Sequence, residues 1–120
     1  MEILFLVPPL ELNENKTYID RVYGCNYGFD YKPPIHLLIL ATIAKQSGHS
    51  VRLLDCSAEG YNLRGLIDYI KKKSSIDMVV FFTVWLSKKE DLFAAKIIHD
   101  IFDNVKIIFT GPYPTWKPEL

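Results

Sequence analysis

Residues 33–55 read PPIHLLILATIAKQSGHSVRLLD, and this stretch decides the fold of the chain. Pro34 suits the first turn of a helix, where its missing N–H is not needed, and Gly48 supplies the left-handed residue that ends one. The stretch therefore predicts a helix, a glycine stop and a strand over residues 50–55, which Asp55 ends.

The helix of this stretch is apolar almost all round. Between residues 35 and 44 only His36 and Thr42 are polar, so no solvated stripe runs along it. We therefore expect it to be covered on both sides. One side suits a β-sheet, and the other needs a second layer, a partner chain, another domain or a large ligand.

The rest of the chain alternates strands and helices. Residues 2–7 are a continuous apolar run that Pro8 and Pro9 stop, which is typical of a strand buried on both faces. Residues 77–83 form the most apolar run, so we expect them at the centre of the sheet. The expected elements are strands over 2–7, 50–55, 77–83 and 105–109 and helices over 35–44, 62–73 and 87–101, the last beginning at a capping box, Ser87 to Glu90.

Two segments are expected to lack regular structure. Residues 10–32 hold four tyrosines and show no period, and they exceed the usual length of a strand-to-helix connection. They are either a lid or partner surface, or a loop ordered merely by packing. Residues 110–120 are too rich in proline for a regular element.

Strand–helix alternation through four strands predicts the α/β class, with a parallel sheet, right-handed crossovers and helices on both faces in three layers. In such sheets the ligand binds outside the carboxyl ends of the strands. Asp55 there is either a ligand contact or a cap, and Tyr113 and Trp116 either stack on a flat ring or pack against a further part of the chain. His36 is more simply a packed residue. The candidate binding residues on this rim are Pro8, Pro9, Leu10, Asp55, Thr83, Val84, Gly111, Pro112, Tyr113, Pro114 and Thr115.

Composition limits the function. The chain has 120 residues, 49% of them hydrophobic, which suits one domain with one core. Its formal charge is zero, so a nucleic-acid partner is not expected. The apolar run 3–7 is too short for a signal peptide or a membrane span. Cys25 and Cys56 have neither a metal-ligand spacing nor a disulfide pattern, and we expect no metal site and a reducing, cytoplasmic setting.

Three stretches together resemble one family. Residues 33–55 are similar to the pattern PPLGLxYLAAxLxxxGHxVxxxD, residues 77–83 (DMVVFFT) to DxVGxS, and residues 111–119 (GPYPTWKPE) to GGPHPTxxPEE. These patterns belong to the N-terminal cobalamin-binding domain of many radical S-adenosylmethionine (radical SAM) enzymes, a group that includes magnesium-protoporphyrin ester cyclases and cobalamin-dependent methylases. Each match alone is weak, and the ordered set is fairly specific.

The resemblance implies a Rossmann-like, flavodoxin-like fold with strand order 2-1-3-4 and a cobalamin whose nucleotide tail lies against the sheet. Thr83, at the family's Ser position, then faces the tail, and Gly111 and Pro112 lie close to it. Thr110 replaces the family's first Gly and Tyr113 its usual His. The sequence has no Asp-x-His-x-x-Gly, so the implied cobalamin is base-off without a histidine ligand.

The resemblance also implies a missing remainder. The family's sheet has five strands and its catalytic barrel carries a Cys-x-x-x-Cys-x-x-Cys motif, whereas this sequence predicts four strands and lacks that motif. We therefore expect residues 1–120 to be a single domain at the N-terminal end of a longer enzyme. The 4Fe-4S cluster and the S-adenosylmethionine would belong to the missing radical SAM domain, and the edge of strand 105–109 would be open to self-association.

Three functions remain open at this stage. The first is the cofactor-holding domain of a radical SAM methyltransferase, cyclase or other oxidoreductase. The second is a scaffold or docking domain of the same fold that has lost cobalamin, because Phe81 replaces a small residue and could fill the tail slot. The third, the N-terminal half of a glycosyltransferase, does not explain the motif at residues 111–119.

Overall fold

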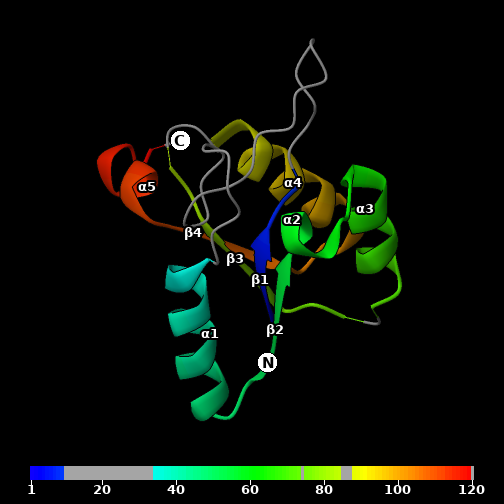
Figure 1. Cartoon of the computed structure of the whole chain (residues 1–120), viewed down its shortest axis with the longest axis horizontal. Coiled ribbons are helices and arrows are strands. Elements are labelled where there is room, and N and C mark those ends of the chain that lie inside the picture. The colour runs from blue at the N-terminus through cyan, green and yellow to red at the C-terminus, as the bar shows by residue number, and fades with distance from the viewer. Residues whose placement is uncertain (10–33, 74, 85–87, 120) are drawn as a thin grey trace.

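The computed structural model describes residues 1–9, 34–73, 75–84 and 88–119, and of Ser57 it describes the backbone alone. Within these residues four strands form one parallel sheet in the order β2-β1-β3-β4 (Figure 1). This confirms the predicted α/β, Rossmann-like fold and its strand order. The strands are β1 (Glu2–Val7), β2 (Ser50–Asp55), β3 (Met78–Phe82) and β4 (Lys106–Thr110).

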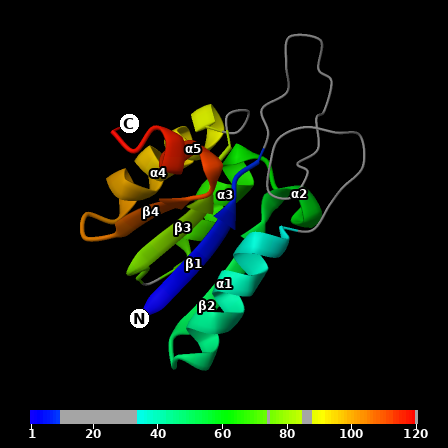
Figure 2. The same ribbon diagram turned by 90° about the vertical axis from the view of Figure 1, so that its left-hand side faces the viewer.

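Helices lie on both faces of the sheet, as predicted. Figure 2 shows α1 (Ile35–Gln46) on one face, and α3 (Leu63–Lys71) and α4 (Lys88–Ile101) on the other. Two short helices, α2 (Cys56–Glu59) and α5 (Pro112–Trp116), begin where β2 and β4 end. The strand ends and the short helices therefore share one edge of the sheet.

The inner strands β1 and β3 divide their side chains between two cores. Phe5 and Val80 pack with Leu37 of α1, whereas Leu6 and Val79 pack with the residues of α3 and α4. This follows from the pleat, which points successive side chains to opposite faces. The predicted central place of β3 is shared with β1, and β2 and β4 form the two edges.

Helix α1 forms as the sequence predicts. Cover was expected on both of its sides, but the described residues cover only one. Gly48 has φ +95°, the left-handed conformation expected at the stop. Leu37 is 1% exposed on the sheet side, whereas Ile39 is 53% exposed. One flank of α1 borders a broad apolar groove of about 390 Å³ over β1, β3 and β4, lined in part by Ile43 and Ile108. The second cover that an apolar helix needs is thus not supplied by this part of the chain.

The expectation that residues 110–120 lack regular structure is wrong, because residues 112–116 form α5. Pro112 and Pro114 both lie in its first turn, where N–H groups have no acceptor within the helix, so neither proline removes a hydrogen bond. The Thr115 hydroxyl donates to the Gly111 carbonyl at 2.8 Å, and the Lys117 N–H donates to the Tyr113 carbonyl at 2.8 Å. The high proline content of this segment was therefore wrongly taken to exclude a helix.

Some expectations fall on residues that the structure does not describe. These are the segment 10–32, Leu10 within it, and Ser87 of the capping box. Among the helices that are described, none is long and apolar enough to cross a bilayer.

We expect Leu37→Ala to lower the free energy of unfolding by about 2 to 5 kcal/mol, because it leaves a cavity between α1 and the sheet. The control Ile39→Ala, on the open side of the same helix, should change it by about 0.5 kcal/mol or less. Urea denaturation of both variants measures the difference. Equal losses would show that α1 is covered on both sides in solution.

Candidate functional site

The carboxyl ends of the strands form a rim, which is the expected ligand position in a parallel α/β sheet. The chain passes from β1 through α1 to β2 on one side, and later strands add on the other side of β1. The switch point of the sheet, where successive connections turn to opposite sides, therefore lies between β1 and β3. Pro8 and Pro9 follow β1 there, and Thr83 follows β3.

Thr83 and Gly111 lie against each other on this rim. The Thr83 N–H donates to the Thr110 carbonyl at 2.8 Å, and the Thr83 carbonyl accepts from the Tyr113 N–H at 3.2 Å. Gly111 has φ +100°, and a Cβ there would lie 3.0 Å from the Thr83 carbonyl oxygen and 3.1 Å from the Phe82 ring. This backbone contact therefore requires glycine for both its conformation and its space.

A buried carboxylate holds the Thr83 side chain. Thr83 is 3% exposed, and its hydroxyl donates to Oδ2 of Asp91 at 2.8 Å. Asp91 is fully buried in the first turns of α4. Because a threonine hydroxyl has one proton and two lone pairs, Thr83 in this arrangement can only accept from any further partner.

The sequence analysis missed Asp91, although a signal was present. Asp91 shares the spacing i, i+3, i+4 and i+7 with Ala94, Ala95 and Ile98, and all four are buried. Phe93, whose apolar side chain suggests the inner face of the same helix, is instead exposed. The spacing alone therefore places an acidic residue, Asp91, on the buried stripe of α4.

The first rim cavity, here called the β4 cavity, lies between α4, β4 and α5 and has a volume of about 290 Å³. Phe109, Tyr113 and Leu92 provide apolar walls, and Thr83 also lines the cavity. Two lysines, Lys88 and Lys117, and two prolines, Pro114 and Pro118, complete the lining. The Lys88 ammonium lies 5.3 Å from the Tyr113 ring centre, and the Lys117 ammonium 4.9 Å from that of Trp116. A flat apolar group that carries a phosphate matches this lining.

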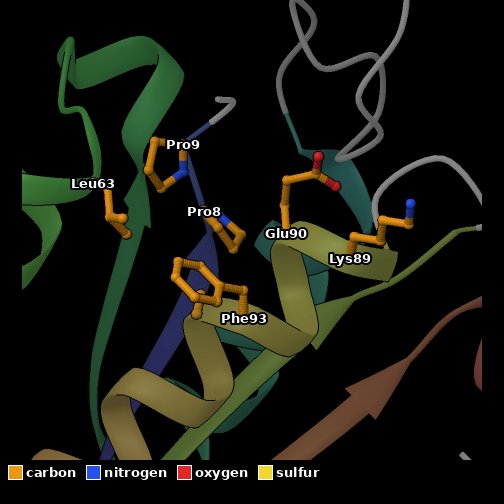
Figure 3. Close-up of a pocket in the computed structure, with 7 residues that line it drawn as sticks. Pro8, Pro9, Leu63, Lys89, Glu90 and Phe93 are labelled. Carbon is orange, nitrogen blue, oxygen red and sulfur yellow. The ribbon is translucent and has the colours of Figure 1, made fainter. Parts of the chain in front are cut away.

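The second rim cavity, here called the switch-point cavity, has a volume of about 280 Å³. Figure 3 shows Pro8 and Pro9 beside Phe93 and Glu90 of α4, with Leu63 of α3 at the far side. The first turns of α4 separate the two cavities, because Lys88 and Leu92 line one while Glu90 and Phe93 line the other.

Other predicted site residues are placed as follows. Asp55 is buried, and its carboxylate accepts from the Ala58 N–H at 3.4 Å, the geometry of a cap for α2. Val84 is partly buried after Thr83.

Tyr113 is buried in edge contact with Trp116, at 6.2 Å between ring centres, and Trp116 is exposed. Pro112 and Thr115 are exposed on α5, and Pro114 is partly buried at the β4 cavity.

Two aromatic contacts define the surroundings. Phe81 is fully buried and stacks on Phe109 at 5.3 Å in the core under α3 and α4, and it is not among the residues that line the β4 cavity. That cavity therefore exists with Phe81 in place. On the other face, the exposed His36 ring stacks on Phe82 at 4.7 Å with an interplanar angle of 6°. Within the described part of the chain, no group of three or more His, Cys, Asp or Glu side chains is placed to hold a metal ion.

The structure is thus a Rossmann-like α/β domain with two cavities at the carboxyl ends of its strands. The chain is 32% identical over 121 residues to a Pyrococcus horikoshii protein named uncharacterized methyltransferase PH0819, and the alignment covers all of this chain. The chain spans about a quarter of that relative, 24% of its length. No protein-family model matches the chain, and no solved structure matches it.

We expect Gly111→Ala to be more destabilising than Gly48→Ala. Both place a side chain at positive φ, which costs about 1 to 2 kcal/mol, but a Cβ at Gly48 would meet nothing within 4 Å. At Gly111 the contacts with Thr83 and Phe82 should add about 1 to 3 kcal/mol. Urea denaturation measures both, and equal losses would contradict the close approach.

We expect Thr83→Val to lower the free energy of unfolding by about 1 to 3 kcal/mol, because buried Asp91 loses a hydrogen-bond donor. The control is Thr42→Val, since the exposed Thr42 hydroxyl donates to the Leu38 carbonyl within α1 at 2.8 Å. That control should change stability by about 0.5 kcal/mol or less. The same small loss at Thr83 would mean that the contact with Asp91 contributes nothing in solution.

Proposed function

We propose that this chain is the cobalamin-holding domain of a radical SAM methyltransferase, with the nucleotide tail of the cofactor in the β4 cavity. The observation that carries the proposal is the contact of Gly111 with Thr83 at the edge of that cavity. The resemblance of the three sequence stretches to cobalamin-binding domains supports cobalamin as the cofactor. The similarity to a protein named a methyltransferase supports the reaction class.

The lining of the β4 cavity suits the parts of a nucleotide tail. Lys88 and Lys117 would bind the phosphate, and Tyr113 and Phe109 would contact the flat base. The Thr83 hydroxyl donates to Asp91, so its lone pairs would accept from a ribose hydroxyl. Each polar group of the cavity then has a partner of the right character.

Bound cobalamin would supply a carrier for the methyl group, and this domain would bind and orient it. The described residues that line the two rim cavities include no histidine. We therefore propose a base-off cofactor without a histidine ligand, held through its tail and the edge of its corrin ring.

The partner of the domain in this proposal is the radical SAM domain of the same enzyme, which would hold the 4Fe-4S cluster and S-adenosylmethionine. The similarity covers 24% of a longer methyltransferase, which agrees with a domain that works as part of a larger protein. The exposed apolar side of α1 and the open edge of β4 are surfaces for that domain or for a second copy. A reducing cytoplasm is the proposed setting.

We expect the purified chain to bind hydroxocobalamin, with a changed visible spectrum and colour that migrates with the protein on gel filtration. Replacing both Lys88 and Lys117 by alanine should weaken binding roughly tenfold or more, because charge-assisted hydrogen bonds to the phosphate are lost. The control Lys96→Ala removes an exposed charge farther along α4 and should bind as the wild type does. A colourless wild-type protein would contradict the proposal and favour a scaffold domain of the same fold.

A further inference from the structure

Glu90 has an unpaired carboxylate oxygen at the switch-point cavity. Its Oε2 atom is buried and has no hydrogen-bond partner among the residues that the structure describes. A buried polar atom without a partner is costly, by about 1 to 3 kcal/mol, and such atoms in folded proteins call for an explanation. On the same helix turn the buried Asp91 carboxylate does have a donor, the Thr83 hydroxyl.

The described surroundings of Glu90 are mostly apolar, and Lys89 is the cationic residue of the cavity lining. Figure 3 shows the two prolines and Phe93 on one side of Glu90 and Lys89 on the other. Pro8 and Pro9 have no N–H, and the side chains of Phe93 and Leu63 have no polar atoms. A ligand in this cavity would therefore meet an apolar wall, the Glu90 carboxylate and the Lys89 side chain.

We propose that the switch-point cavity binds the edge of the corrin ring and that Glu90 accepts a hydrogen bond from one of its peripheral primary amides. This inference rests on the proposed function, since it names a contact of the same cofactor. A primary amide fits because it is a neutral donor, and moving it out of water costs less than moving an ammonium group. The methyl-rich edge of a corrin fits the prolines and Phe93.

The position of the cavity agrees with this assignment. It lies at the switch point between β1 and β3, on the same rim as the β4 cavity, and the first turns of α4 separate the two. One large ligand can therefore place its tail on one side of this turn and its ring edge on the other. Glu90 then acts as a binding residue. Its buried oxygen, which is unpaired in the free protein, gains a hydrogen bond when the ligand binds.

The test compares hydroxocobalamin with cobinamide, a corrin that keeps the peripheral amides and lacks the nucleotide tail. We expect Glu90→Ala to weaken the binding of both ligands by a similar factor, roughly tenfold or more. The lysine replacements in the β4 cavity should weaken cobalamin and leave cobinamide nearly unchanged. The matched control is Asp100→Asn, an exposed acid at the far end of α4.

The thermal stability of the ligand-free variants separates binding from a structural role. Glu90→Ala should unfold within a few degrees of the wild type, because it removes an oxygen that has no partner to lose. Two results would overturn this inference and leave the proposed function standing. In the first, Glu90→Ala binds cobalamin as tightly as the wild type does. In the second, the wild type binds cobalamin but does not bind cobinamide. No binding of either ligand by the wild type would overturn both.

Discussion

The contact between the backbone after β3 and the backbone after β4 is the constraint on which the rest of the rim depends. Thr83 and Gly111 approach so closely that a single Cβ would meet a carbonyl oxygen at 3.0 Å. Two backbone hydrogen bonds, from Thr83 to Thr110 and from Tyr113 to Thr83, hold this approach. They set the direction of α5, and α5 in turn closes one wall of the β4 cavity.

Helix α4 connects this constraint to the remainder of the site. Asp91 fixes the Thr83 hydroxyl from inside the protein, while the residues on either side of Asp91 face different cavities. The same helix turn therefore organises the floor of one cavity and the wall of the other. The paired Asp91 and the unpaired Glu90 oxygen differ because the fold supplies a donor to one and a ligand is proposed to supply it to the other.

Sequence patterns predicted the sheet well because buried parallel strands leave a continuous apolar run. The strand order and the glycine stop of α1 are confirmed. Helix α5 was missed, since proline count does not distinguish a first turn, where proline is tolerated, from a helix interior. Glu90 was read only as part of a capping box, and Asp91 was missed although its spacing to Ala94, Ala95 and Ile98 places it on the buried stripe of α4.

The placement of the candidate residues was predicted unevenly. Thr83 and Gly111 come together because both follow parallel strands, a consequence of topology alone. Asp55 caps α2 by a local hydrogen bond that the sequence left as one of two alternatives. The shape of each cavity depends on side-chain packing between separate elements, so strand and helix patterns do not contain it.

The central claim is that a cofactor occupies the strand-end rim of this domain. Amide chemical shifts of the isotope-labelled chain, followed by NMR during titration with hydroxocobalamin, test it residue by residue. The account predicts saturable shifts at Thr83, Gly111 and Tyr113 and none at Ser50, Asp77 and Lys106, which lie at the opposite ends of the strands. Shifts concentrated at those opposite ends, or no saturable shifts at all, would contradict it.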